Sequence, residues 1–166
     1  MTVTTALILL ARVLHIVSST VWAGFVMLVG FWFIGPHIDG DPDRARRLRQ
    51  TMVNRAASLV APAALVSVAS GLYLFRTLHG GAWSRADLVL AVGAITAVLS
   101  FLVGAIGTGP PERRLAQLDA LVARGAARTA EVAEIAALER RVQLAARVIA
   151  ILLLVSCGAM AVARYL

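Results

Sequence analysis

The chain has 166 residues, of which 60% are apolar and only 15% are charged, and 13 glycines raise the non-polar share further. Soluble domains are roughly 45–50% apolar and about a quarter charged, so this composition excludes a water-soluble globular protein. The length allows one helical unit and leaves no room for a separate soluble domain with its own core. The single cysteine, Cys157, excludes a disulfide framework and a cysteine-based zinc or iron–sulfur site within one chain.

Four stretches are nearly free of charge and reach the roughly 20 residues that a helix needs to cross about 30 Å of hydrocarbon. In lipid each stretch must be helical, because an isolated strand would leave its backbone groups unpaired. We therefore predict an all-α fold, in which residues 1–166 form a single four-helix transmembrane domain with cytoplasmic helical extensions. The predicted spans cover about residues 6–34, 56–78, 86–106 and 148–165.

The positive charge is a topology signal. All 16 basic residues are arginines, and 12 of them lie between the first and second spans or between the third and fourth. By the positive-inside rule these two loops are cytoplasmic, which predicts a multi-pass protein of the bacterial cell (inner) membrane with both termini extracytoplasmic. No aromatic residues interleave with the arginines, so we expect them to meet anionic lipid headgroups and not nucleic acid.

Glycine and proline divide the cytoplasmic segments into further helices. A helix is predicted to start around Arg44 and to continue into the second span, with a kink at Pro62. Residues 108–112 break the helix after the third span and restart it with proline in the first turn. Gly125 interrupts the next amphipathic stretch, and a second one begins near Thr129 and runs into the fourth span. The sequence therefore predicts a helical layer on the cytoplasmic side.

Small residues recur along the third span at spacings of four and three. Such a face allows two helices to approach closely in lipid, which favours a packing role over a functional one. The residues are Gly93, Ala97, Ser100, Gly104 and Gly107.

Polar residues collect on one face of the first span. Arg12, His15, Ser18, Ser19 and Trp22 follow one another at spacings of three and four. In one interpretation Arg12 extends to the outer headgroups and His15 makes one interhelical hydrogen bond. In the other, His15 ligates a metal, most readily the iron of haem b, and Arg12 pairs with a haem propionate one turn nearer the outer surface. The residues leave both interpretations open.

A second haem ligand can be sought by counting depth along the spans. At the helical rise, His15 is level with residues 67–70 of the second span and with the Cys157 to Met160 segment of the fourth. Met160 and Cys157 are therefore the candidates within the bundle. His79, at the outer end of the second span, is a further candidate that requires a tilt or an unequal helix offset, whereas His37 at the cytoplasmic turn is excluded by depth.

Copper is the alternative metal, because thioether, thiol and imidazole groups are suitable ligands for it. The residues concerned are scattered along the chain: His15, Met27, Cys157 and Met160. No buried carboxylate pair, phosphate-binding glycine motif or serine nucleophile motif is present. Asp87, the acid nearest to a span interior, is expected to cap the third helix or to pair with a nearby arginine. The sequence therefore predicts no catalytic residue and leaves enzyme activity open.

The segments Leu14-His15-Ile16, Trp22-Ala23-Gly24 and 55–71 with its internal proline resemble a known group of proteins. They are similar to the first half of the small four-helix membrane proteins related to copper resistance protein D and to HemJ-type protoporphyrinogen oxidase. In the HemJ type a first-helix histidine is associated with haem binding and a third-helix lysine with activity. The resemblance implies the first role for His15. The lysine has no counterpart, because this chain contains no lysine.

These observations lead to three expectations about function. The first is a membrane-embedded subunit that binds haem or is linked to a redox reaction, with His15, Arg12, Met160 and His79 at the cofactor. The second is a structural subunit of a larger membrane complex without its own cofactor. The third is a copper-handling membrane protein. In each case the partners expected are the lipid bilayer and other membrane subunits.

Overall fold

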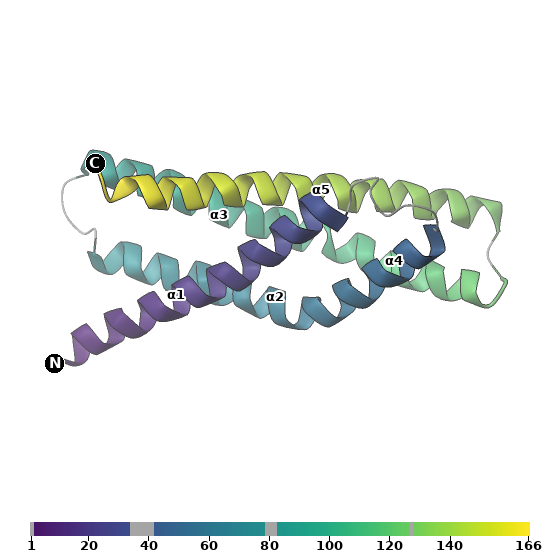
Figure 1. The fold of residues 1–166 in the computed structure, drawn as a ribbon, viewed down its shortest axis with the longest axis horizontal. Helices are drawn as coiled ribbons and strands as arrows, with labels where there is room; N and C mark the ends of the chain where they lie inside the picture. Colours follow the sequence, from purple (N-terminus) through teal and green to yellow (C-terminus); the bar gives the residue numbers. More distant parts are fainter. Residues whose placement is uncertain (1, 34–41, 79–82, 127) are drawn as a thin grey trace.

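The computed structural model describes residues 2–33, 42–78, 83–126 and 128–166. Within these ranges the chain is helical and contains no β-strand, which confirms the predicted all-α class. The elements follow in the order α1 (Val3–Met27), the π-helical turn η1 (Leu28–Phe33), α2 (Pro42–Leu78), α3 (Arg85–Gly107), α4 (Gly109–Ala123) and α5 (Thr129–Ala163). Figure 1 shows an elongated bundle with both termini at one end, the termini end.

The first helix begins at a threonine cap, where the Thr2 hydroxyl accepts a hydrogen bond from the Thr5 amide at 3.3 Å. The sequence predicts one continuous helix to residue 34, but the α-helix ends at Met27 and the wider π-helical turn η1 follows it. Gly30 of this turn lies against α5, where an added Cβ would be 3.1 Å from the Ala146 carbonyl oxygen. The turn thus brings the end of the first span into close contact with the last helix.

The helix α2 runs unbroken through the predicted cytoplasmic segment and the second span. It starts at Pro42, close to the predicted start at Arg44, and proline is tolerated there because the first-turn amides lack helical partners. Pro62 lies inside the helix, where it removes one backbone hydrogen bond. Figure 1 shows α2 bent along its length, as the proline predicts.

Local signals set the ends of the remaining helices. At the start of α3 the Ser84 amide donates to Asp87 Oδ2 at 2.8 Å and the Asp87 amide donates to Ser84 Oγ at 3.2 Å. This reciprocal cap confirms the expected role of Asp87. Helix α4 ends at Ala123, and Gly125 follows its C-cap with a φ of 65°, a left-handed conformation that favours glycine. Helix α5 begins at Thr129, as predicted.

The helices associate as two pairs, α1 with α2 and α3 with α5, and α4 folds back onto the first turns of α5. A cluster of buried residues joins the two pairs in the middle of the bundle. It consists of Trp22, Ala23, Ala64, Ile149 and Leu153. Between α4 and α5 a second cluster is formed by Leu115, Leu118, Ile135 and Val142. Through the second cluster, α4 and the start of α5 pack as a helical hairpin. The helices that the sequence predicts in this segment are therefore present.

The small residues of α3 face α5, which confirms their packing role. An added Cβ at Gly93 would be 3.2 Å from Ala159 Cβ, and one at Gly107 would be 3.2 Å from Ala145 Cβ. One hydroxyl also crosses this interface, since Ser156 Oγ donates to the Gly93 carbonyl oxygen at 2.8 Å. The glycines therefore allow the backbones of α3 and α5 to approach each other closely from Gly93 to Gly107.

Within the described ranges, four helical segments are long and apolar enough to cross a membrane, as befits a multi-pass membrane protein. They are Val3–Phe31, Ser58–Leu78, Arg85–Ala123 and Thr129–Ala163. The predicted spans 6–34, 56–78, 86–106 and 148–165 coincide with parts of these segments, except for a few residues at their ends. Residue 34, the end of the first predicted span, lies outside the described residues.

Candidate functional site

His15 lies in the interface between α1 and α2, half-buried, with its ring against α2. Its Nδ1 atom is 2.9 Å from the backbone carbonyl oxygen of Ser67. A carbonyl oxygen can only accept, so Nδ1 carries the proton in this hydrogen bond, and in the neutral imidazole Nε2 then keeps its lone pair. This contact places His15 at the level of Ser67, as depth counting predicts. In the part of the chain that the structure describes, no protein hydrogen-bond partner lies at Nε2.

Three serines surround this contact. Ser19 Oγ donates to the His15 carbonyl oxygen and lies 2.7 Å from Ser67 Oγ, so a hydroxyl pair links α1 to α2. Ser70 Oγ donates to the Val66 carbonyl oxygen and lies 3.4 Å from His15 Nδ1. Because the hydroxyls of Ser19 and Ser70 donate to helix carbonyls, the ring nitrogen is held mainly by the Ser67 carbonyl.

Gly71 makes room for the imidazole. A Cβ at this position would be 2.8 Å from His15 Cε1, which is too close for real atoms, and 3.1 Å from His15 Nδ1, which is tighter than most real contacts. The ring therefore packs directly on the backbone of α2, one turn beyond Ser67. The role of Gly71 could not be predicted from the sequence, because a lone glycine in an apolar span is usually a packing residue and nothing local distinguishes it.

Arg12 is the other ionisable residue in this part of α1. It is exposed and lies about 60° around the helix from His15, one turn nearer the termini end. None of the described acidic side chains forms an ion pair with it. Arg12 therefore lies near the His15 site, but its guanidinium is not held in the α1–α2 interface.

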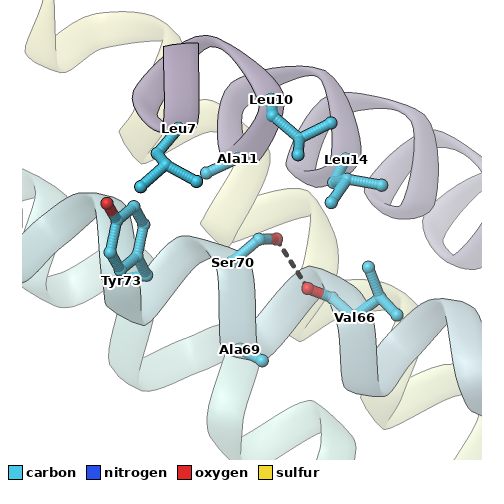
Figure 2. Close-up of a pocket in the computed structure, with 8 residues that line it drawn as sticks. All are labelled: Leu7, Leu10, Ala11, Leu14, Val66, Ala69, Ser70 and Tyr73. Carbon is cyan, nitrogen blue, oxygen red and sulfur yellow. Dashed lines mark hydrogen bonds between the residues drawn. The ribbon is translucent and has the colours of Figure 1, made fainter. Parts of the chain in front are cut away.

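An apolar groove runs along the α1–α2 seam on the termini side of His15, with a volume of about 370 Å³ (Figure 2). Leu7 and Tyr73 face each other at one end of it, and Leu14 and Val66 at the other. Its lining consists of Leu7, Leu10, Ala11, Leu14, Val66, Ala69, Ser70 and Tyr73. The one aliphatic hydroxyl in this lining, that of Ser70, is directed at the Val66 carbonyl oxygen, so the groove is apolar along its length.

Among the described residues, the other predicted ligands make contacts elsewhere in the bundle or are exposed. Met160 lies against α3, with its Cγ 3.7 Å from an added Cβ at Gly93, and Cys157 is exposed on α5. Met27 packs beside the central cluster around Trp22. The described residues contain no group of three or more His, Cys, Asp or Glu side chains that could hold a metal ion. The predicted copper ligands therefore remain as scattered in the fold as they are in the sequence.

Two of the histidines considered in the sequence analysis, His79 and His37, lie outside the described residues. Helix α2 ends at Leu78, about 16 Å of helical rise beyond Ser67. His15 is thus the only histidine within the described ranges, and the site rests on this single imidazole.

The α4–α5 hairpin carries most of the described charge at the end of the bundle opposite the termini. Arg114 forms two parallel hydrogen bonds with Glu134, at 2.8 and 3.0 Å. The hydrogen bond from Arg114 lowers the pKa of Glu134 below its usual value, and its contact with Glu134 raises the pKa of Arg114. The remaining arginines of the hairpin and of the following turns are exposed: Arg113, Arg124, Arg128, Arg140, Arg141 and Arg147.

Comparison of the chain with protein-family models, with curated proteins and with solved structures finds no match in any of the three.

Proposed function

We propose that this protein is a multi-pass protein of the bacterial cell membrane that binds haem b through His15, as a haem-binding or redox-linked subunit. The observation that carries the proposal is the 2.9 Å hydrogen bond from His15 Nδ1 to the Ser67 carbonyl oxygen. Histidines that ligate metals commonly donate their other ring proton to such a group, which fixes the tautomer and makes the ligand more basic. The resemblance of residues 14–16 and 22–24 to haem-associated membrane proteins supports the same role.

The unused nitrogen favours a ligand over a purely structural histidine. A single interhelical hydrogen bond needs only one donor, and the neighbouring serines show that hydroxyls already link these two helices. A ring nitrogen without a partner in lipid lacks the hydrogen bond that it makes in water, whereas coordination of a metal would satisfy it. The neutral imidazole with its proton on Nδ1 is the form that binds haem iron.

Two other residues fit the same role. Gly71 holds the ring on the backbone of α2, since any side chain there would displace it. Arg12, exposed and one turn nearer the termini end, would pair with a propionate. Met160 belongs to the α3–α5 pair, so we propose His15 as the sole axial ligand from the described part of the chain. Haem bound at this position would supply a one-electron redox centre inside the bundle.

The proposed orientation follows from the arginines. The hairpin of α4 and the start of α5 lies at the end of the bundle opposite both termini (Figure 1), and its arginines are exposed. We place this end in the cytoplasm beside anionic headgroups and both termini outside. The arginines between residues 44 and 55 belong to the same proposed side, and their side chains lie outside the described residues.

The test is the absorbance spectrum of detergent-purified protein produced with haem precursor. Wild-type protein should show a Soret band, His15→Ala should lose it, and added imidazole should restore part of it by replacing the missing ligand. Gly71→Ala should weaken haem retention because its Cβ would collide with the ring, whereas Gly24→Ala, which meets nothing within 4 Å, should not. A colourless wild-type protein would refute haem binding and leave the structural subunit as the better interpretation.

A further inference from the structure

The groove between α1 and α2 lies next to the His15 site but needs its own explanation. It is formed by two helices that are long and apolar enough to cross a membrane, and the leucines that line it are about half exposed. Along α1 it extends from Leu7 to Leu14, about 10 Å at the helical rise. Inside a bilayer such a groove is filled by a neighbouring molecule, because an empty apolar space loses its dispersion contacts.

A positive charge continues the groove on α2. Val66, Ala69, Tyr73 and Arg76 follow one another at spacings of three and four, so Arg76 extends the groove-lining row by one turn. Arg76 is exposed and lies in the last turn of α2, which ends at Leu78. The groove therefore leads from an apolar interior to a cation at the end of a predicted span.

Tyr73 marks the transition between these two zones. Figure 2 shows its ring facing Leu7 at one end of the groove, with the hydroxyl at the edge of the lining. Tyrosine is common where a helix passes from hydrocarbon to headgroups, because its ring is apolar and its hydroxyl is polar. The row on α2 thus has the order apolar, amphipathic and positive, which matches the order acyl chain, glycerol region and phosphate in a phospholipid.

We infer that the α1–α2 groove binds one acyl chain of an anionic phospholipid whose headgroup pairs with Arg76. This inference requires the helices to lie in a bilayer but does not depend on haem binding. A single arginine near the membrane surface contributes a preference of about fivefold for an anionic over a neutral headgroup. The groove supplies the position of the lipid, and Arg76 supplies the selectivity between headgroups.

The experiment counts lipids bound to the detergent-purified full chain by native mass spectrometry after addition of phosphatidylglycerol or phosphatidylcholine. Wild-type protein should retain one phosphatidylglycerol with about a fivefold preference. Arg76→Gln should reduce this preference to near one, while Arg164→Gln, at the same end on α5, should keep it. Retention of phosphatidylglycerol that is equal to that of phosphatidylcholine in wild-type protein would overturn the inference.

A second pair of variants tests the groove itself. Ala69→Phe places a ring in the groove and should lower retention of both lipids at least several-fold, because the acyl chain loses its position. Ala61→Phe is the control, since Ala61 is exposed on the same helix but lies about 110° around it from the groove-lining row. Unchanged lipid retention in Ala69→Phe would also overturn the inference, as would a dimer that retains no lipid.

Discussion

The two helix pairs of the bundle are held together in different ways. Between α3 and α5, glycines bring the backbones together and a single hydroxyl, that of Ser156, crosses the interface. Between α1 and α2, the contacts around His15 are polar, and a groove remains open beside them. Close packing and interhelical hydrogen bonds are the two means of helix association in lipid, and each pair relies mainly on one. His15, the candidate ligand, lies in the pair that leaves a groove open.

The largest effect is expected in the interface of α3 and α5, where glycines bring the two helices together. Gly93→Leu should destabilise the bundle by about 3 kcal/mol, because even a Cβ there would be 3.3 Å from the Ser156 carbonyl oxygen and a leucine would push α5 away. Equilibrium unfolding in detergent measures this loss. Gly158→Leu is the matched control on α5, since nothing lies within 4 Å of its Cβ, and it should be nearly neutral. Equal losses in the two variants would contradict the packing role of α3.

Removal of single hydroxyls should have smaller effects that differ between the two pairs. Ser156→Ala removes the hydrogen bond to the Gly93 carbonyl oxygen and should cost about 0.6 kcal/mol, with about 1.7 kcal/mol as the upper range. Ser19→Ala should cost less, because Ser67 can redirect its hydroxyl to a carbonyl of its own helix. The same unfolding measurement ranks the two variants. The reverse order would show that the hydroxyl pair is the stronger link.

The smallest effect on stability is expected at the exposed ion pair of Arg114 and Glu134 in the hairpin. Because its folded-state pKa is lowered, Glu134 stabilises the hairpin above its ordinary pKa of 4.5, and this contribution is lost as the pH falls through the lower folded value. Arg114 stays charged throughout, so it adds no transition in acid. The hydrogen-exchange protection of the Leu118 amide, corrected for intrinsic rate, should therefore decrease from about pH 6 to about pH 3. Glu134→Gln should show a flatter dependence, and identical curves would contradict the role of the pair.

Features that depend on a few neighbouring residues could be predicted from the sequence. The cap at Asp87, the break at Gly125 and the start of α5 at Thr129 all follow from capping and turn preferences, and the structure confirms them. The wide turn at Leu28–Phe33 could not be predicted, because no pattern in that apolar segment distinguishes a π-helical turn from a regular one. This turn includes the contact of Gly30 with Ala146 of α5, a residue that is distant in the sequence.

The candidate site shows the same limit. Counting residues gives depth, so the level of His15 with Ser67 could be predicted. Counting does not show how each helix is rotated about its axis or which helices pair. The hydrogen bond to the Ser67 carbonyl oxygen and the space at Gly71 could therefore not be predicted. Met160 was expected near His15 for its depth, yet its contact with Gly93 shows that it belongs to the other helix pair.

Because α5 runs without a break from Thr129 to Ala163, it forms one rigid rod about 50 Å long. Its first turns contact α4 and its later turns contact α3, so one continuous helix joins the charged hairpin to the termini end. The α1–α2 pair contacts this helix through the cluster around Trp22 and through Gly30, near the middle of its length. The hairpin and the His15 region are thus linked through a single helix and one buried cluster.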